Sequence, residues 1–220
     1  MKIPKDKMGL AKYKHIIWDW NGTLFNDAEL CCSIMNHLLT KRNMNSITLQ
    51  DYKSVFTFPV RDYYQKVGHD VSDENWEVLS YEFINEYESR KNECGLYQHA
   101  VEVLEFIDLK GISQSVLSAY SQSSLEEIVK SFNLDKYFIK LVGLNNIYAA
   151  SKLENGKKWM SELGFENSEV LLIGDTVHDF EVAEEIGADC LLISNGHQNK
   201  NKLVQSSAIV INSISEILSN

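Results

Sequence analysis

Short, nearly continuous apolar runs recur along the chain and predict buried strands. One run covers residues 16–18, and five more follow: SVLS at 115–118, IKLVG at 139–143, VLLIG at 170–174, CLLIS at 190–194 and AIVI at 208–211. Because small or polar residues bound each run, we expect strands covered on both faces, as in a parallel sheet.

Helical patterns lie between these runs. Two apolar stripes at helical spacing separate neighbouring strands, namely Leu125, Ile128, Val129 and Phe132, and then Phe180, Ala183 and Gly187. Alternation of strand and helix predicts an α/β fold built on a doubly wound parallel sheet. Ligands of such folds bind beyond the carboxyl ends of the strands.

Residues 27–95 break this alternation. Two helical stripes occur there, one formed by Ala28, Cys31, Met35, Leu38 and Leu39 and the other, within 72–92, by Trp76, Leu79, Phe83 and Tyr87. The pattern contains no clear buried strand. We therefore expect a core domain made of residues 1–26 and 96–220, with a helical cap domain of residues 27–95 inserted over the strand ends as a lid.

Length and composition fit this organisation. The 220 residues suffice for one core domain and a smaller inserted unit, and 44% hydrophobic with 24% charged residues is ordinary for a globular protein. No apolar run approaches the roughly 20 residues that cross a bilayer, and the basic N-terminus lacks the apolar stretch of a secretion signal. The four cysteines form no CxxC pair, so Cys31 and Cys32 are expected to fill the core in a reducing, cytoplasmic compartment.

The charge balance narrows the choice of partner. The chain has 21 Lys and Arg against 31 Asp and Glu, a formal net charge of −10. This surface argues against nucleic acid or an anionic membrane as the main partner. It would also repel a phosphorylated ligand unless cations gather at one site. Monomer and homodimer both remain open.

The first stretch with chemical character is Asp19-Trp20-Asn21-Gly22-Thr23, directly after the first strand. A carboxylate at a strand end can attack phosphorus. Gly22 lets the backbone turn close to a ligand, and the Thr23 hydroxyl with nearby N–H groups can hold phosphate oxygens. A strand followed by an ordinary Asn-Gly turn explains the same residues, so this stretch alone decides nothing.

Two further positions supply a hydroxyl and a cation. Ser118, followed by Ala119, ends the second strand and can bind a phosphate oxygen, although serine ends many strands. Lys152 lies at an expected helix start, where its ammonium could offset the charge between a carboxylate and a phosphate. Lys157 and Lys158 fit a solvated helix face better.

The last stretch is GDTVHD at 174–179. Asp175 and Asp179, four residues apart at a strand-to-helix turn, can share a hard cation such as Mg²⁺ directly or through water. An aspartate or Thr176 could instead cap the helix that follows. The two interpretations are compatible.

Together, in this order, these stretches resemble the motifs of the haloacid dehalogenase superfamily of phosphatases. The resemblance covers about residues 13–212. The family's D-x-D-G-T/V motif is matched by DWNGT except at its second acid, and its later Ser/Thr, Lys and GDxxxD motifs by Ser118, Lys152 and GDTVHD. The insertion resembles the helical cap of the phosphoglycolate phosphatase and β-phosphoglucomutase branch, which implies a Rossmann-like core with that cap.

The resemblance implies a Mg²⁺-dependent phosphoric monoester hydrolase that acts on a small phosphorylated metabolite through an aspartyl-phosphate at Asp19. It implies a metal held by Asp19, the backbone carbonyl of Asn21 and Asp175, with Asp179 in support, and Lys152 as the neutralising cation. The phosphate would be held by Gly22, Thr23, Ser118 and Ala119.

Asn21 departs from the family pattern, because the family has an acid there that protonates the leaving group and later activates water. An amide cannot act as a general acid or base at neutral pH, and losing such help costs on the order of 10²–10⁴ in rate. Three explanations stay open: a good leaving group such as an acyl or aryl phosphate, another proton donor such as His178 or a cap residue, or a phosphometabolite-binding protein with weak turnover. A fourth hypothesis is deamidation of Asn21 to Asp, which a following glycine favours.

The cap contributes further candidates. In the stretch 55–68, Arg61 beside Tyr63 and Tyr64 could bind a carboxylate or second phosphate of the substrate, or could be a surface arginine near packed aromatics. His197 could approach the site or be an ordinary loop residue.

Two other classes of function remain. A phosphonatase-like C–P hydrolase would also lack the second acid and would need a cap lysine for a Schiff base. Lys41, Lys53 and Lys66 are available for that role. A dehalogenase fits less well, because the phosphate- and Mg²⁺-binding residues are present. The non-enzyme alternative is a ligand-binding or regulatory protein.

Overall fold

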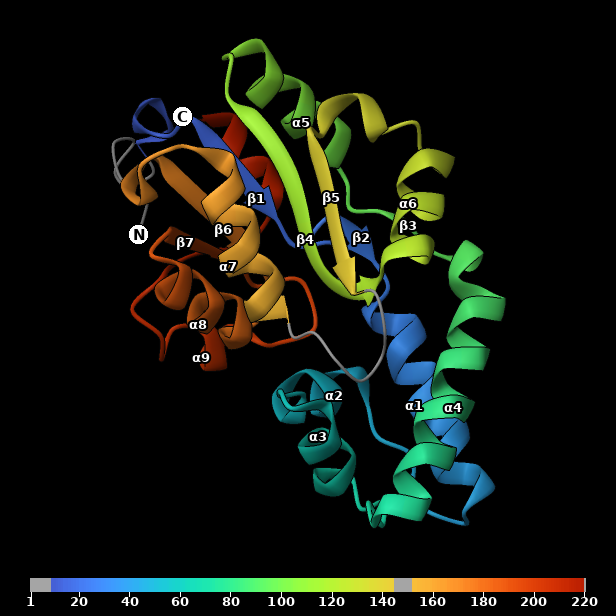
Figure 1. Ribbon diagram of the computed structural model, residues 1–220. Helices are drawn as coiled ribbons and strands as arrows, with labels where there is room; N and C mark the ends of the chain where they lie inside the picture. Colours follow the sequence, from blue (N-terminus) through green and yellow to red (C-terminus); the bar gives the residue numbers. More distant parts are fainter. Residues whose placement is uncertain (1–8, 145–151, 220) are drawn as a thin grey trace.

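A computed structural model of the chain describes residues 9–144 and 152–219 and divides them between a sheet-based core and a helical cap (Figure 1). The main sheet consists of β1 (His15–Trp18), β4 (Ser113–Ser121), β5 (Lys140–Leu144), β6 (Val170–Gly174), β7 (Asp189–Ile193) and β8 (Ile209–Ile211). The strand order is β5-β4-β1-β6-β7-β8, and every neighbouring pair is parallel. The predicted parallel sheet is confirmed, and each apolar run falls on one of its strands.

Helices cover both faces of the sheet, as the doubly wound prediction requires. The core helices are α5 (Ala100–Leu109), α6 (Gln122–Ser131), α7 (Lys152–Leu163) and α8 (Val177–Ile186), with the shorter α9 (Lys200–Leu203) and the 3-10 turns η1 (Leu10–Lys12), η3 (Asp135–Tyr137), η4 (Asn167–Glu169) and η5 (Ile214–Ser219). Ile17 packs with Trp159 of α7 and Val182 of α8, whereas Ile16 belongs to the cluster that contains Leu104 of α5. Successive side chains of β1 therefore serve opposite layers.

The regular elements of the cap within residues 28–93 are all helices, and the cap lies at the carboxyl ends of the strands, toward which the arrows of β4 and β5 point (Figure 1). It contains α1 (Ala28–Lys41), α2 (Leu49–Val55), α3 (Val60–Lys66), α4 (Asp73–Arg90) and η2 (Lys91–Glu93). The two predicted apolar stripes fall on α1 and α4, which pack against each other. Glu82 of α4 binds Lys41 and Arg42 at the end of α1, which adds ion pairs to that apolar contact.

A two-stranded antiparallel ribbon joins the cap to the core. It pairs β2 (Phe25–Asn26) with β3 (Gly95–Leu96), Phe25 opposite Leu96. The sequence pattern does not predict this ribbon, because two-residue strands are too short to show a period. Of the proposed domain limits, Asp27 directly follows β2, whereas Gly95 is the first residue of β3 and so lies within the ribbon.

Aromatic side chains connect the helices inside the cap. Tyr63 and Tyr64 are both buried, Tyr63 with its ring 5.5 Å from that of Tyr52 in α2, and Tyr64 with its ring 5.1 Å from that of Trp76 in α4. These contacts favour packed aromatics over a substrate-binding role for the two tyrosines.

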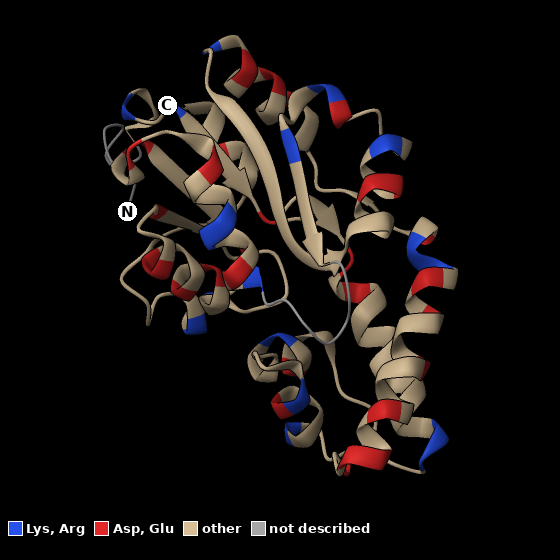
Figure 2. Cartoon of the chain, in the orientation of Figure 1, with Lys and Arg blue, Asp and Glu red and all other residues tan. Residues whose placement is uncertain are grey.

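Charged residues lie mostly on the helices, and the strands of the main sheet are almost free of them (Figure 2). This distribution follows from a sheet that is covered on both faces. Within residues 9–144 and 152–219, no helix is both long and apolar enough to cross a bilayer.

Candidate active site

The carboxyl ends of three adjacent strands bring the candidate residues together. Asp19 follows β1, Ser118 lies near the end of β4 and Asp175 follows β6, and β1 lies between the other two strands. The backbone N–H of Asp19 donates to the carbonyl of Ile173 at 2.8 Å, which continues the β1–β6 pairing into the site. All three side chains are buried, so the arrangement is part of the folded core.

Lys152 lies between two of the candidate carboxylates. It begins α7, it is buried, and its ammonium donates to Asp19 Oδ1 at 2.5 Å and also to Asp179 Oδ1. Burial alone would lower the pKa of Lys152, but Asp179 and Asp19 outweigh burial and raise it. The lysine is therefore held as a cation between the two acids.

Thr23 connects Asp19 to Asp175. Its hydroxyl lies 3.1 Å from Asp175 Oδ1 and 3.4 Å from Asp19 Oδ2. The other oxygen of Asp175 accepts the backbone N–H of His197 at 2.6 Å. Asp175 is thus oriented from two segments that are far apart in the sequence.

Asp179 binds the lysine and also forms a capping box with Thr176, the N-cap residue of α8. Its Oδ2 accepts the N–H groups of Asp175 at 3.2 Å and Thr176 at 3.0 Å, and the Thr176 hydroxyl at 2.7 Å. Its Oδ1 accepts the Lys152 ammonium. The capping and site interpretations of GDTVHD are therefore compatible, because Asp179 Oδ2 binds the start of α8 while Oδ1 binds Lys152.

The electrostatics of this cluster favour an additional cation. Burial raises the pKa of Asp19 to about 8 against the opposing effect of Lys152, and burial raises the pKa of Asp175 to about 6. Burial also acts to raise the pKa of Asp179, but Lys152 outweighs it and the net shift is downward. One oxygen from each of the three aspartates lies within 4.8 Å of the others. Hard oxygen donors this close, with the Lys152 ammonium among them, fit Mg²⁺.

Asn21 faces a second buried network at the junction of core and cap. Its Nδ2 donates to Asp27 Oδ2 at 2.8 Å and to the Tyr87 hydroxyl of α4 at 2.7 Å. The Tyr87 hydroxyl in turn donates to Asp27 Oδ2 at 2.7 Å, and the Gly22 N–H donates to Asp27 Oδ1 at 3.0 Å. Asp27 is thus the centre of the network that holds the Asn21 side chain.

His197 joins this network to the Asp19 cluster. Its Nε2 lies 3.2 Å from Asp27 Oδ1, and its Nδ1 lies 2.8 Å from the Tyr52 hydroxyl of α2. Burial alone would lower the pKa of His197, but Asp27 outweighs burial and raises it to about 9. Of the two interpretations left open by the sequence, the position beside the site is correct, because the His197 N–H also binds Asp175.

Gly22 is required by the close packing here. Its φ is +77°, and a Cβ on it would lie 2.4 Å from both Asp175 Oδ2 and His197 Cδ2. Its N–H is already bound by Phe25 and Asp27. Gly22 therefore contributes a tight turn rather than a free donor for phosphate.

Asp27, Tyr52 and Tyr87 were not recognised from the sequence as site residues. Asp27 immediately precedes a helix, where an acid is ordinary, and the tyrosines occupy apolar stripes of helices. Only the fold brings them to Asn21 and His197, so no local pattern distinguishes them.

The other candidate residues are Ser118 and Ala119, near the end of β4, and Arg61 in the cap helix α3. The Ser118 hydroxyl accepts the Tyr120 N–H at 3.1 Å, and Ala119 is exposed. The Arg61 guanidinium donates to the carbonyl of Val71 and to Asp73, so it braces the segment that leads into α4 and is not brought to Asp19.

Two further side chains have contacts of their own. His178 lies 3.3 Å from Glu181 and stacks on Phe58, with ring centroids 4.6 Å apart. The Lys53 ammonium donates to the carbonyl of Asn195 at 2.8 Å, and burial lowers its pKa. Lys53 is thus bound to the loop that carries His197.

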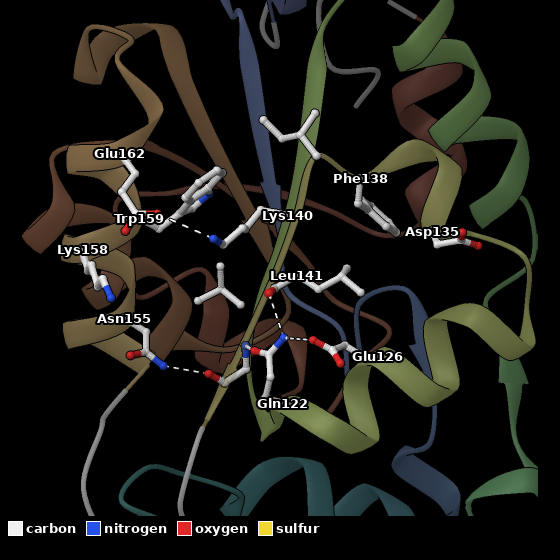
Figure 3. A pocket seen from close by; sticks show the side chains of 13 residues that line it. Gln122, Glu126, Asp135, Phe138, Lys140, Leu141, Asn155, Lys158, Trp159 and Glu162 are labelled. Carbon is white, nitrogen blue, oxygen red and sulfur yellow. Dashed lines mark hydrogen bonds and ion pairs between the residues drawn. The ribbon is translucent and has the colours of Figure 1, made fainter.

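An open groove runs along β5, the edge strand of the sheet, between α6 and α7 (Figure 3). Its volume is about 560 Å³. Gln122 Nε2 donates to the Leu141 carbonyl at 3.0 Å across it, and Asn155 Nδ2 donates to the Gly143 carbonyl at 2.8 Å. None of the candidate carboxylates lines this groove, so it is distinct from the Asp19 cluster.

The family follows from a match over most of the chain. Residues 16–193 match the model of the haloacid dehalogenase-like hydrolases, and the chain belongs to that family. This confirms the resemblance that the four motifs carried, and it places the chain in a family of hydrolases.

Two individual relatives share less than 25% sequence identity with this chain, but each match covers more than 80% of both proteins. The chain is 24% identical over 206 residues to a 5'-nucleotidase of Pseudomonas aeruginosa, with 87% of each protein covered. It is 22% identical over 184 residues to the pyrophosphatase PpaX of Bacillus cereus, with 83% of this chain and 84% of that protein covered.

A solved structure from Clostridium acetobutylicum, described as a predicted phosphatase, superposes with a TM-score of 0.80 at 20% identity. The match covers 93% of this chain and 96% of that one. A solved structure from Haemophilus somnus, described as a predicted phosphoglycolate phosphatase, superposes with a TM-score of 0.74 at 18% identity and covers 94% of this chain and 97% of that one. At these identities the structural matches establish the fold.

Proposed function

We propose that the chain is a Mg²⁺-dependent phosphatase that removes phosphate from a small phosphorylated metabolite. The observation that carries the proposal is the buried Asp19 carboxylate at the end of β1, flanked by Lys152, Asp175 and Asp179. The chain belongs to a family of hydrolases, which supports the same class of reaction. Two of its relatives are named as a nucleotidase and a pyrophosphatase, which supports it as well.

In the proposed reaction, an Asp19 oxygen attacks phosphorus while the bond from phosphorus to the leaving oxygen breaks. The leaving group departs with the bonding electron pair, and Asp19 carries an aspartyl-phosphate. Water then attacks phosphorus and releases Asp19. Lys152, Thr23 and Ser118 are the side chains that we assign to charge neutralisation and to binding of phosphate oxygens.

A divalent ion completes the proposal, because three buried carboxylates and one ammonium leave excess negative charge. The ion would be held by Asp19, Asp175 and the backbone carbonyl of Asn21. Asp179 would orient the Asp175 backbone and Lys152. When bound, Mg²⁺ supplies charge stabilisation for the transferring phosphoryl group. Phosphoryl transfer depends mainly on such positioning and neutralisation.

The proposal includes the remaining expectations for partner and location. The ligand is a small phosphorylated molecule rather than nucleic acid or a membrane surface, and the reaction takes place in the cytoplasm, where free thiols such as those of Cys31 and Cys32 persist. The cap, residues 27–95 by the proposed limits, covers the substrate.

The alternatives receive less support. The relatives and neighbours named above are hydrolases of phosphate compounds, which disfavours the phosphonatase-like reaction. Lys53, one of the cap lysines, donates to the Asn195 carbonyl and would have to break that hydrogen bond to form a Schiff base. Borohydride trapping with a phosphonoaldehyde would detect such an adduct.

Mg²⁺-dependent phosphate release from p-nitrophenyl phosphate tests the proposed function. Lys152→Ala should lower kcat/KM by at least about 10²-fold, because it removes the cation that contacts Asp19. Lys157→Ala is the matched control, since Lys157 is an exposed lysine on the same helix. Equal activity of the two variants, or activity that survives Asp19→Ala, would contradict the proposal.

A further inference from the structure

The orientation of the Asn21 amide limits which phosphate compounds this site can use. Nδ2 has two hydrogens, and both are bound, one by Asp27 Oδ2 and one by the Tyr87 hydroxyl. An ionised carboxylate only accepts hydrogen bonds, so the amide nitrogen and not Oδ1 must face Asp27. Asn21 Oδ1 is therefore left on the other side, as an acceptor that cannot give a proton.

Asp27 cannot take over the missing acid role, because all its acceptor positions are filled. Oδ1 faces the Gly22 N–H and His197 Nε2, and Oδ2 faces Asn21 Nδ2 and the Tyr87 hydroxyl. The Cys31 thiol also faces Oδ2 at 3.8 Å, so a proton on either oxygen would collide with one of five donors. Asp27 is thus a fixed carboxylate that holds the cap, the turn and the Asn21 amide together.

The side chains around Asp27 also form hydrogen bonds within this network. The Tyr87 hydroxyl hydrogen is donated to Asp27, and the two ring nitrogens of His197 are occupied by Asp27 and the Tyr52 hydroxyl. The Asn21 amide, the Gly22 N–H and the Tyr87 hydroxyl each donate to a buried acceptor in this network. Protonating a leaving group from here would break a buried hydrogen bond, which is unfavourable.

We infer that this site, acting as the proposed phosphatase, selects phosphate compounds whose leaving group departs as a stable anion without a proton, namely acyl phosphates and phosphoanhydrides. Phosphate esters of alcohols need the proton that position 21 lacks. The inference rests on the proposed function and names the substrate class of the same site.

The reaction balances without a protein acid. An Asp19 oxygen forms a bond to phosphorus, and the carboxylate or phosphate leaving group departs as an anion with the bonding pair. Water oxygen then bonds to phosphorus as the Asp19–phosphorus link breaks. One water hydrogen stays on the released phosphate, and the other passes to solvent, while Asn21 Oδ1 can accept a hydrogen bond from that water and orient it.

A leaving-group series tests the inference. With Mg²⁺ present, kcat/KM is measured by phosphate release for acetyl phosphate, pyrophosphate, substituted phenyl phosphates and glycerol phosphate. We expect kcat/KM to fall steeply as the leaving group becomes more basic, by on the order of 10²–10⁴ from acetyl phosphate to glycerol phosphate. A flat series would overturn the inference while the proposed function stands. Asp19-independent release, or none from any compound, would overturn both.

The Asn21→Asp variant, measured with the same series of compounds, provides a second test. Its carboxyl would lie beside Asp27 and Tyr87, and a proton shared there should flatten the series, raising glycerol phosphate turnover at least about 10-fold relative to acetyl phosphate. Asn26→Asp makes the same chemical change at an exposed position five residues away and should keep the steep series. A series unchanged in Asn21→Asp would contradict the role that we assign to the amide.

Discussion

At the scale of single residues, His15 shows how burial fixes a protonation state. It lies at the start of β1, with Nδ1 2.7 Å from the Ser113 hydroxyl and Nε2 2.7 Å from the Ser115 hydroxyl. Burial lowers the pKa of His15 to about 4, whereas an unfolded chain would take up the proton near pH 6.5. The unfolded state therefore binds more protons below pH 6.5, and stability falls as the pH is lowered toward 4.

We expect His15 to contribute a loss of about 2–3 kcal/mol in unfolding free energy between pH 7 and pH 4.5. Urea unfolding of the wild type and of His15→Gln at both pH values measures it. The glutamine cannot titrate, so its loss should be smaller by that amount. Equal losses would show that His15 is not held neutral.

Asn21 allows a second prediction, on deamidation. Conversion to Asp requires the Gly22 nitrogen to attack the Asn21 side chain, but Phe25 and Asp27 hold the Gly22 N–H, and both amide hydrogens of Asn21 are bound. We therefore expect Asn21 to stay intact in folded, aged protein and to deamidate only in urea. Peptide mass mapping measures this, with the Asn195-Gly196 pair as a control in urea. Conversion of Asn21 in the folded protein would restore the deamidation hypothesis.

At the scale of elements, the sequence predicted what depends on local pattern. Strands such as Val170–Gly174 are continuously apolar because both faces are covered, and that signal is readable without the fold. Asp19 and Asp175 are predicted together because each directly follows such a strand, and Lys152 is predicted from its place at an expected helix start. The Asp27 network was not predicted, because Asp27, Tyr87 and His197 come from three distant segments and meet only after the cap has packed.

Gln198 provides the prediction at this scale, because it joins a core helix to the cap. Its buried side chain accepts the Val177 N–H at the start of α8 at 2.8 Å and donates to the Phe56 carbonyl at the end of α2 at 3.0 Å. Phe56 keeps Lys202 as a second donor, so Gln198→Leu would leave mainly the Val177 N–H without a partner.

We expect Gln198→Leu to cost about 1–3 kcal/mol of unfolding free energy and to speed hydrogen exchange at Val177. Gln205→Leu makes the same exchange at an exposed position and should be close to neutral. If the two variants are equally stable, the contact between α2 and α8 does not hold the cap as described.

At the scale of the whole molecule, the site is assembled across the boundary of core and cap. Asn21 and Asp27 meet Tyr87 of α4, and His197 meets Tyr52 of α2, while the β2–β3 ribbon carries both chain crossings. Buried hydrogen bonds thus hold the cap beside the turn that carries Asn21, and the substrate selection that we infer depends on this arrangement.

The net charge of −10 supports the last prediction, because the whole protein's field repels a phosphorylated substrate on its way to Lys152 (Figure 2). Salt screens that repulsion, with a screening length of about 30 Å at 0.01 M and about 10 Å at 0.1 M. We therefore expect kcat/KM for p-nitrophenyl phosphate to rise with salt over this range, while kcat stays constant. The double variant Glu74→Lys and Glu105→Lys, both at exposed positions, should weaken the salt dependence. A kcat/KM that falls with added salt in the wild type would mean that local cations at the site, rather than the total charge, govern substrate approach.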